Sequence, residues 1–504
     1  MTDLITAYQS HLPRLASSNS IGSLLRVYLA DGLVQPQELI ASLAKGEEDP
    51  IEHPNDFLLR CRHFLSVLFL AKLSHQLSDS LLAVATLFFD RLERSSYWTT
   101  FQTGATLLEI GASLIGKAHP NQEATLLTTG GALKESGRCM IDGAIPQPLM
   151  NAQLALNWLY LGIANREEKQ IQAGLKVARF LLRLCDSEQR FFHALWTRES
   201  ECQLAELFSY CQLLFHVAAT ISAEKTFAAQ AKALTDQLSQ LPDEMRMPAD
   251  PFVIILALVF DKIERDNLVP KVTDETHRQI TETEMGLLRY DYRTLSLACT
   301  ASGVNTGLGA LHKGKITIAS FGPHFYPLAD SERYGFYRTC SGNPEEIGDV
   351  KIHHDPEACR FRGWSRLVFP NEMVDLGCHF SAVYPGDQWM WFDLKAKEGL
   401  VDLTVKFPDC KKESPLAFVF FITAEQILIE DNQPLIPGVL DQFRGQSTPI
   451  RAVTGDHELK IVPHKSAAEM QVIPLSGKNH FWATSFLIAF SAQTEPHRLA
   501  WTIS

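Results

Sequence analysis

The segment Phe321–Arg338, FGPHFYPLADSERYGFYR, concentrates side chains that can move protons and bind anions. Histidine and tyrosine can act as general acids and bases, and arginine can bind an anion through two parallel hydrogen bonds. A nearby cation also lowers the pKa of a tyrosine hydroxyl, which makes the phenolate available as a base. The alternative is an ordinary loop whose arginines pair with Asp330 and Glu332. We predict an acid–base site with an anion clamp, formed by His324, Tyr326, Arg333, Tyr334 and Arg338.

Two further groups of aromatic and amide side chains could hold a ligand with flat rings and hydroxyl groups, such as a sugar. Trp389 and Trp391 alternate along one predicted strand and would share a face. Asn157, Trp158 and Tyr160 lie on one predicted helix, where Asn157 and Tyr160 are three residues apart and share a face. Packing of these side chains in the core is the alternative in both places. We keep them as candidate substrate-binding residues.

Composition excludes several classes of protein. The net charge is −12 and the isoelectric point is near 5.8, without a basic stripe, so we expect neither nucleic acid nor a membrane surface as partner. The ten cysteines form no CxxC pair, and no phosphate-binding glycine loop occurs, so we expect no metal and no cofactor. No standard signal peptide precedes the first helix, which favours a cytoplasmic protein, although non-classical secretion stays open. Nothing in the sequence predicts the oligomeric state.

The first half of the chain has the apolar spacing of amphipathic helices. Residues 54–74 repeat apolar side chains at intervals of three and four, and Ser78-Asp79 has the pattern of a helix start. Similar segments predict helical hairpins stacked in series over residues 1–270, which is typical of a helical toroid. The predicted helices span about 2–15, 20–31, 36–44, 54–74, 78–95, 99–116, 122–142, 149–164, 167–185, 200–220 and 223–240.

The second half changes to the two-residue alternation of strands. Polar residues 271–290 are the predicted linker, and residues 291–504 are the predicted antiparallel β-sandwich, because strands with one apolar face need a second sheet to cover it. The fold class is therefore an α+β multidomain protein, with a helical toroid followed by a large sandwich. The predicted strands span 315–321, 373–383, 388–394, 400–407, 416–422, 426–430, 458–462, 482–490 and 497–503.

This order of domains resembles the polysaccharide lyases with an (α/α) toroid and a β-sandwich, the heparinase II/III-like and chondroitin AC lyase-like enzymes. The segment Leu416–Arg444 is similar to the strand-turn-strand regions of such sandwiches. The resemblance implies β-elimination on an acidic oligosaccharide or polysaccharide at the domain junction. It further implies that Tyr326 or Tyr334 acts as base and acid, that His324 assists, and that Arg333 or Arg338 holds the uronate.

Two other classes remain open on the sequence. One is a non-catalytic scaffold that binds a glycan or a protein. The other is a glycoside hydrolase with a helical toroid, which needs two carboxylates across a cleft. Nothing in the sequence selects such a pair from the possible donors, which are Glu109, Glu135, Asp142, Glu199 and Glu206.

Overall fold

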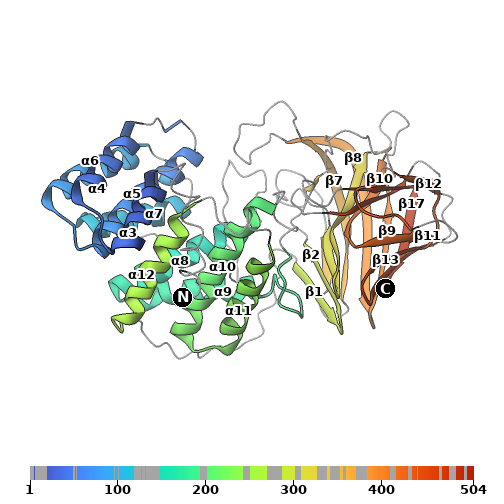
Figure 1. The fold of residues 1–504 in the computed structure, drawn as a ribbon. Helices are drawn as coiled ribbons and strands as arrows, with labels where there is room; N and C mark the ends of the chain where they lie inside the picture. The colour runs from blue at the N-terminus through green and yellow to red at the C-terminus, as the bar shows by residue number, and fades with distance from the viewer. Residues whose placement is uncertain are drawn as a thin grey trace. The chain divides into compact units, whose positions relative to one another are not determined.

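A computed structural model gives the fold of the chain as two compact units (Figure 1). Unit 1 comprises Met1–Leu127, Pro148–Leu182 and Cys202–Arg278, and unit 2 comprises Thr128–Gln147, Arg183–Glu201 and Gln279–Ser504. The residues described are 5, 20–48, 51–52, 54–95, 97–99, 102–118, 127, 131, 148–192, 201–241, 250–268, 287–300, 308–325, 338–340, 352–355, 359–370, 383–408, 416–429, 434–439, 441–464, 468–475, 484–492 and 497–504.

Unit 1 is helical, as the sequence predicts. Phe69 on α5 contacts Tyr160 on α8 edge to face, with ring centroids 5.1 Å apart, and it stacks on Phe252 of α12 at 6.3 Å. Helices far apart in the sequence therefore share one core. The described helices are α3 (Ser20–Asp31), α4 (Pro36–Glu48), α5 (Pro54–Leu73), α6 (Asp79–Arg94), α7 (Gln102–Ile115), α8 (Pro148–Asn165), α9 (Glu168–Leu182), α10 (Glu201–Ser222), α11 (Lys225–Gln240) and α12 (Phe252–Arg265), with a short 3₁₀ turn at Tyr97–Thr99.

Local signals set several of these helix boundaries. Ser78 is the N-cap of α6, and its hydroxyl accepts a hydrogen bond from the backbone N–H of Leu81, as the Ser78-Asp79 pattern predicts.

Part of α10, Leu204–Ser222, is long and apolar enough to cross a membrane by length and composition. However, 78% of its most apolar window is buried inside the protein, which is the behaviour of a core helix.

Unit 2 contains two antiparallel sheets (Figure 1). The eight-stranded sheet has the order β1-β2-β3-β4-β10-β16-β15-β12, and the nine-stranded sheet has the order β11-β13-β14-β17-β9-β8-β7-β5, with β6 paired to β7. The strands are β1 (Leu287–Tyr292), β2 (Leu295–Thr300), β3 (Gly309–Lys313), β4 (Ile316–Phe325), β5 (Arg338–Cys340), β6 (Ile352–Asp355), β7 (Arg360–Pro370), β8 (Val383–Lys397), β9 (Leu400–Lys406), β10 (Leu416–Thr423), β11 (Gln426–Ile429), β12 (Phe443–Gln446), β13 (Ile450–Thr454), β14 (His457–Pro463), β15 (Glu469–Pro474), β16 (Phe486–Ser491) and β17 (Arg498–Ile503).

One hydrophobic core takes side chains from both sheets, so the two sheets form a sandwich. Trp501 of the nine-stranded sheet is 1% exposed and packs against Phe418, Phe420 and Phe490 of the eight-stranded sheet. The distances between the ring centroids are 5.0 to 5.4 Å. Strand β9 alternates buried and exposed residues over its whole length, as one-sided burial requires. Residues 373–382 of the predicted strand 373–383 lie outside the described residues. The predicted fold class is confirmed.

Candidate functional site

The predicted segment Phe321–Arg338 is described only in part. His324 lies in β4 opposite Ala417 of β10, on the face of the eight-stranded sheet that turns away from the main core. Its side chain is 3% exposed. Arg338 opens β5, of which only the backbone is described, and Tyr326, Arg333 and Tyr334 lie outside the described residues. The proposed roles of these side chains therefore stay predictions.

The aromatic and amide residues of α8 are inside the helical unit. Asn157, Trp158 and Tyr160 each expose 2% of their surface or less. The amide nitrogen of Asn157 donates a hydrogen bond to the hydroxyl of Thr106, 3.0 Å away, and thereby ties α8 to α7. Burial raises the pKa of the Tyr160 hydroxyl. These three side chains build the core in this structure, and a role in binding sugar stays a prediction.

The tryptophans of β8 lie on the outward face of the nine-stranded sheet. Met390 and Phe392 belong to the sandwich core, and the residues that alternate with them, Trp389 and Trp391, are half-buried on the opposite face. The alternative that both indoles pack in the core is therefore wrong. Each indole is therefore half-buried on the outward face, and Lys406 Nζ lies 4.9 Å from the centre of the Trp391 ring.

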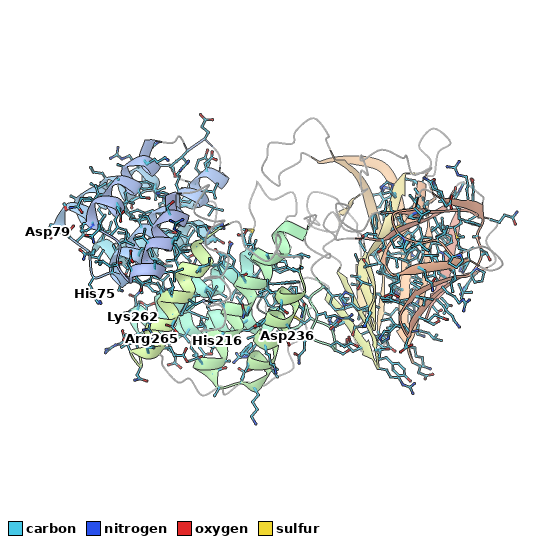
Figure 2. The ribbon with its side chains drawn as sticks, in the orientation of Figure 1. His75, Asp79, His216, Asp236, Lys262 and Arg265 are labelled. Carbon is cyan, nitrogen blue, oxygen red and sulfur yellow. The ribbon has the colours of Figure 1, made fainter. Side chains whose placement is uncertain are left out.

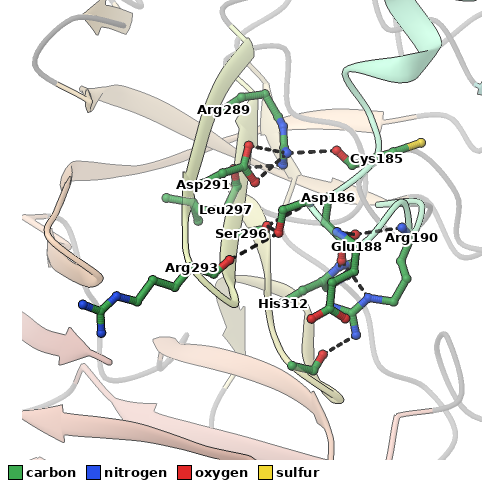
Figure 3. Close-up of polar contacts among 12 residues, drawn as sticks. Cys185, Asp186, Glu188, Arg190, Arg289, Asp291, Arg293, Ser296, Leu297 and His312 are labelled. Atoms are coloured by element: carbon green, nitrogen blue, oxygen red, sulfur yellow. Dashed lines mark hydrogen bonds and ion pairs between the residues drawn. The ribbon is translucent and has the colours of Figure 1, made fainter. Parts of the chain in front are cut away.

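A buried polar cluster in unit 2, which we call the clamp, joins residues 185–192 to strands β1 to β3 (Figure 3). The Asp186 carboxylate accepts hydrogen bonds from the backbone N–H groups of Glu188 and Arg190, at 2.9 and 2.7 Å. Its second oxygen accepts from Arg190 Nε at 2.7 Å and from His312 Nδ1 at 2.8 Å. An ionised carboxylate can only accept, so Nδ1 carries the proton of the His312 ring.

Burial and neighbouring charges shift the pKa values of Asp186 and His312 in the clamp. Burial alone would raise the pKa of Asp186, but the hydrogen bond and charge of His312 and the charge of Arg190 lower it below its usual value. Burial lowers the pKa of His312 against the pull of Asp186. The His312 ring also stacks on Phe192 with centroids 4.3 Å apart. Because both oxygens of Asp186 are occupied, we interpret the clamp as a structural anchor of residues 185–192.

A second buried cluster, which we call the helical cluster, brings together four segments of unit 1. Arg62 of α5 donates from Nη1 to Asp250 Oδ2 and from Nη2 to Gln153 Oε1 of α8, both at 2.9 Å. The same Nη1 atom lies 3.8 Å from Glu206 Oε1 of α10. Asp250 also accepts from the backbone N–H of Phe252 at 2.9 Å, at the start of α12. The helical cluster thus joins α5, α8, α10 and Asp250, two residues before α12.

The helical cluster holds a carboxyl group that titrates near neutral pH. Burial raises the pKa of Glu206 to about 7; the charge of Arg62 opposes this increase, and that of Asp250 adds to it. Its side chain is 13% exposed, and those of Arg62 and Asp250 are each 16% exposed, so solvent reaches the cluster. A carboxyl with such a pKa can donate and accept protons at physiological pH, which is the requirement for general acid–base catalysis.

The helical cluster also contains a hydrogen-bond donor that is not used. Gln153 is 5% exposed, and its Nε2 atom has no hydrogen-bond partner among the described residues, although its Oε1 atom binds Arg62. An amide nitrogen buried without a partner costs about 1 to 3 kcal/mol. Such a group is a candidate donor to the oxygen of a ligand. Gln153 and Glu206 are therefore two candidate ligand-binding groups of the helical cluster.

The sequence indicates only part of this cluster. Glu206 is one of five possible carboxylates, and nothing in the sequence favours it over the others. Arg62 has the spacing of an ordinary polar position in α5, and Asp250 precedes the apolar run Phe252–Phe260 as a helix-start residue. Glu135, Asp142 and Glu199 lie outside the described residues, and Glu109 accepts a hydrogen bond from Gln170 at 3.2 Å.

The charged surface near the end of α12 does not form a comparable site. His216 lies 3.6 Å from Glu264, Lys262 pairs with Asp266 and Arg265 with Asp261, the last two pairs one helical turn apart. Figure 2 labels His216, Lys262 and Arg265 on their helices. Several of these side chains are more than a third exposed, and such pairs contribute little. Within the described residues no group of three or more His, Cys, Asp or Glu side chains is arranged to hold a metal ion.

The chain is thus a helical unit followed by a two-sheet antiparallel sandwich, and its resemblance to polysaccharide lyases is one of architecture. The chondroitin AC lyase of Streptomyces coelicolor A3, solved with chondroitin sulphate, matches 93% of this chain over 70% of its own length, with 11% identity and a TM-score of 0.48. A Paenibacillus xanthan lyase matches all of this chain over 59% of its own, with 9% identity and a TM-score of 0.37. No protein-family model matches the sequence, and neither does a curated protein.

Proposed function

We propose that this protein is a carbohydrate-active enzyme that binds an acidic polysaccharide and cleaves it by β-elimination. The observation that carries the proposal is the Glu206 carboxyl in the helical cluster, which is buried beside Arg62 and has a pKa of about 7. Elimination from a uronate polymer needs a group that takes up and returns protons, and a carboxyl that is half protonated at neutral pH does both.

The proposed reaction begins with removal of a proton and ends with protonation of the leaving oxygen. A base removes the proton on the carbon next to the uronate carboxylate, that electron pair forms a carbon–carbon double bond, and the bond to the 4-linked oxygen breaks. An acid then protonates the leaving oxygen. From the sequence we assign Tyr326 or Tyr334 with His324 to these transfers, and Arg333 or Arg338 to the uronate. In the helical unit, we assign Glu206 as a further acid–base group that takes up or returns one of these two protons. We assign the amide N–H of Gln153, which has no partner among the described residues, as a donor to a sugar oxygen.

Hydrolysis is less well supported by the same residues. A glycoside hydrolase needs the glycosidic bond between its two carboxylates. Glu206 and Asp250 instead face one nitrogen of Arg62, at 3.8 and 2.9 Å, so a guanidinium group stands where the substrate would be. This pair is therefore not suited to flank a glycosidic bond.

The direct test is the absorbance of unsaturated uronate products on a panel of acidic polysaccharides. We expect product with the wild type, and a kcat about 100-fold lower for Glu206→Gln, because general acid–base catalysis contributes on that order. Glu224→Gln is the matched control, because Glu224 is also a carboxylate of the helical unit bound to an arginine, Arg179, at 2.7 Å. Its kcat should equal that of the wild type.

Three results would contradict the proposal. The first is the absence of unsaturated product on every substrate of the panel. The second is equal activity of Glu206→Gln and Glu224→Gln, which would remove Glu206 from the reaction. The third is full activity of both Tyr326→Phe and Tyr334→Phe. Glycan binding without any product would favour the non-catalytic scaffold.

A further inference from the structure

The outward face of the nine-stranded sheet carries an ordered row of cationic and aromatic side chains. In the register of the strands, Arg498 of β17 lies opposite Lys406 of β9, and Lys406 lies opposite Trp391 of β8. The Lys406 ammonium nitrogen is 4.9 Å from the centre of the Trp391 ring. Lys406 and Arg498 are exposed, and Trp391 is half-buried. One line across three strands therefore presents two cations beside an indole face.

The tight turn between β8 and β9 fixes this register. Glu398 and Gly399 have φ angles of 52° and 80°, and a two-residue hairpin turn with both φ angles positive matches the twist of its strands. Lys397 thus pairs with Leu400, and the pairing continues to Trp391 and Lys406. A slip by one residue would turn Trp391 into the core, so burial of Met390 and Phe392 also holds the indole outward.

The neighbouring rows, which extend from these three strands to β7, add to the positive charge. Arg360 binds Asp393 through two hydrogen bonds, at 2.8 and 2.5 Å, and Asp402 accepts a hydrogen bond from Thr502 at 2.6 Å. Both carboxylates of these rows therefore have partners. The described side chains of the rows comprise five cations against these two carboxylates, namely Arg360, Arg362, Lys395, Lys406 and Arg498. This surplus of positive charge stands out on a chain with a net charge of −12.

We propose that this face, which we call the cationic face, is a binding surface for an acidic polysaccharide. Sugar rings stack on the indole of Trp391, and Trp389 lies about 7 Å further along β8 on the same side of the sheet. The acidic groups of the polymer bind Lys406, Arg498 and Arg362. Charge complementarity selects a polyanion, and the half-buried indole beside the cations selects a polymer of rings.

This inference takes the class of glycan from the proposed function, but it does not depend on catalysis. The cationic face lies in unit 2, whereas Glu206 and Arg62 lie in unit 1. The cationic face holds the polymer. Substitutions in this face should therefore raise KM for long substrates and leave kcat and the cleavage of short oligosaccharides unchanged.

The test is equilibrium binding of chondroitin sulphate and of neutral dextran to the full chain, at low and high salt. We expect the wild type to bind chondroitin sulphate, with an affinity that falls as salt screens the charges, and not to bind dextran. Trp391→Ala should weaken binding by about threefold to tenfold. The double variant Lys406→Gln/Arg498→Gln changes only exposed side chains, so it should fold normally and show a weaker dependence on salt.

Arg451→Gln is the matched control, because Arg451 is an exposed cation on β13 of the same sheet, outside these rows. Its affinity should equal that of the wild type. The inference would be overturned if the face variants bound chondroitin sulphate with the affinity of the wild type, or if Arg451→Gln lost as much affinity as they do. Binding of dextran as tight as that of chondroitin sulphate would also overturn it. If the face variants lose binding while no substrate is cleaved, the inference stands and the proposed function fails. If oligosaccharides are cleaved while the face variants bind polymer normally, the proposed function stands and the inference fails.

Discussion

The clamp and the helical cluster are both buried groups of charged side chains. The pKa of the carboxyl group is lowered in the clamp and raised in the helical cluster. Asp186 in the clamp accepts four hydrogen bonds, and its pKa is lowered. Glu206 in the helical cluster faces Arg62 at 3.8 Å, and its pKa is raised to about 7. A satisfied network makes a structure rigid, whereas an incompletely satisfied one stores free energy that a ligand can release. The difference separates an anchor from a candidate reaction site.

The largest expected effect is on the clamp. Asp186→Ala should lower the free energy of unfolding by about 3 to 5 kcal/mol, because it leaves Arg190 and His312 without their buried partner. Urea unfolding followed by near-ultraviolet circular dichroism measures the loss. Asp402→Asn on the exposed face is the control and should change stability by less than about 0.5 kcal/mol. A loss as small as that of the control would show that the clamp is not an anchor.

Glu206→Gln should act in the opposite direction. A folded pKa of about 7 against 4.5 means that the folded state binds more protons than the unfolded state between these values. Stability from this carboxyl is therefore present at pH 4.5 and falls as the pH rises to 7. Removing the charge should stabilise the protein at pH 8 by up to about 3 kcal/mol.

The measurement for Glu206→Gln is urea unfolding at pH 5 and pH 8, with Glu224→Gln as control. The free energy of unfolding of Glu206→Gln should exceed that of the wild type at pH 8 and equal it at pH 5. The same variant should lose activity, because functional sites often lower the stability of a protein. A destabilised variant at pH 8 would contradict the assignment, because it would make Glu206 a stabilising ion-pair partner of Arg62.

The smallest effect concerns acidification of the whole protein. Because the pKa of His312 is lowered in the folded state, the unfolded chain binds an extra proton below pH 6.5, and the clamp loses stability as the pH falls. The helical cluster gains stability over the same range. Amide hydrogen exchange should therefore quicken in β3 and slow in α10 between pH 7 and pH 5, after correction for the intrinsic rates. Changes of the same sign in both elements would refute the comparison.

Periodicity predicted most of the helices and the longer strands, because burial of one face is a local property of the sequence. α5 and β9 follow their apolar spacing within a residue or two. The strand β1 begins at Leu287, within the predicted linker 271–290, since LLRYDY carries an arginine and an aspartate that hide its alternation. Residues 183–192 begin inside the predicted helix 167–185 yet belong with the sandwich, because α9 ends at Leu182 and Asp186 finds its partner His312 on β3.

The candidate site was harder to predict than the fold. Arg62 and Asp250 are 188 residues apart in the sequence, and no spacing rule links them. The pKa of Glu206 depends on burial among helices that are distant in sequence, so no local pattern could reveal it. The tryptophans of β8 show the opposite case: their alternation was visible, but only the register with β9 determined which side faces out.

The pH titration of the carboxyl ¹³C resonance of Glu206 measures the proton affinity of this group directly. We expect a midpoint near pH 7 in the free protein, and a shift of that midpoint when an acidic oligosaccharide is added. Glu224 in the same spectrum is the internal reference and should not respond to the oligosaccharide. A Glu206 midpoint near the ordinary value of 4.5 would contradict its assignment as an acid–base group at neutral pH. A midpoint that the oligosaccharide leaves unchanged would contradict its place in the binding site.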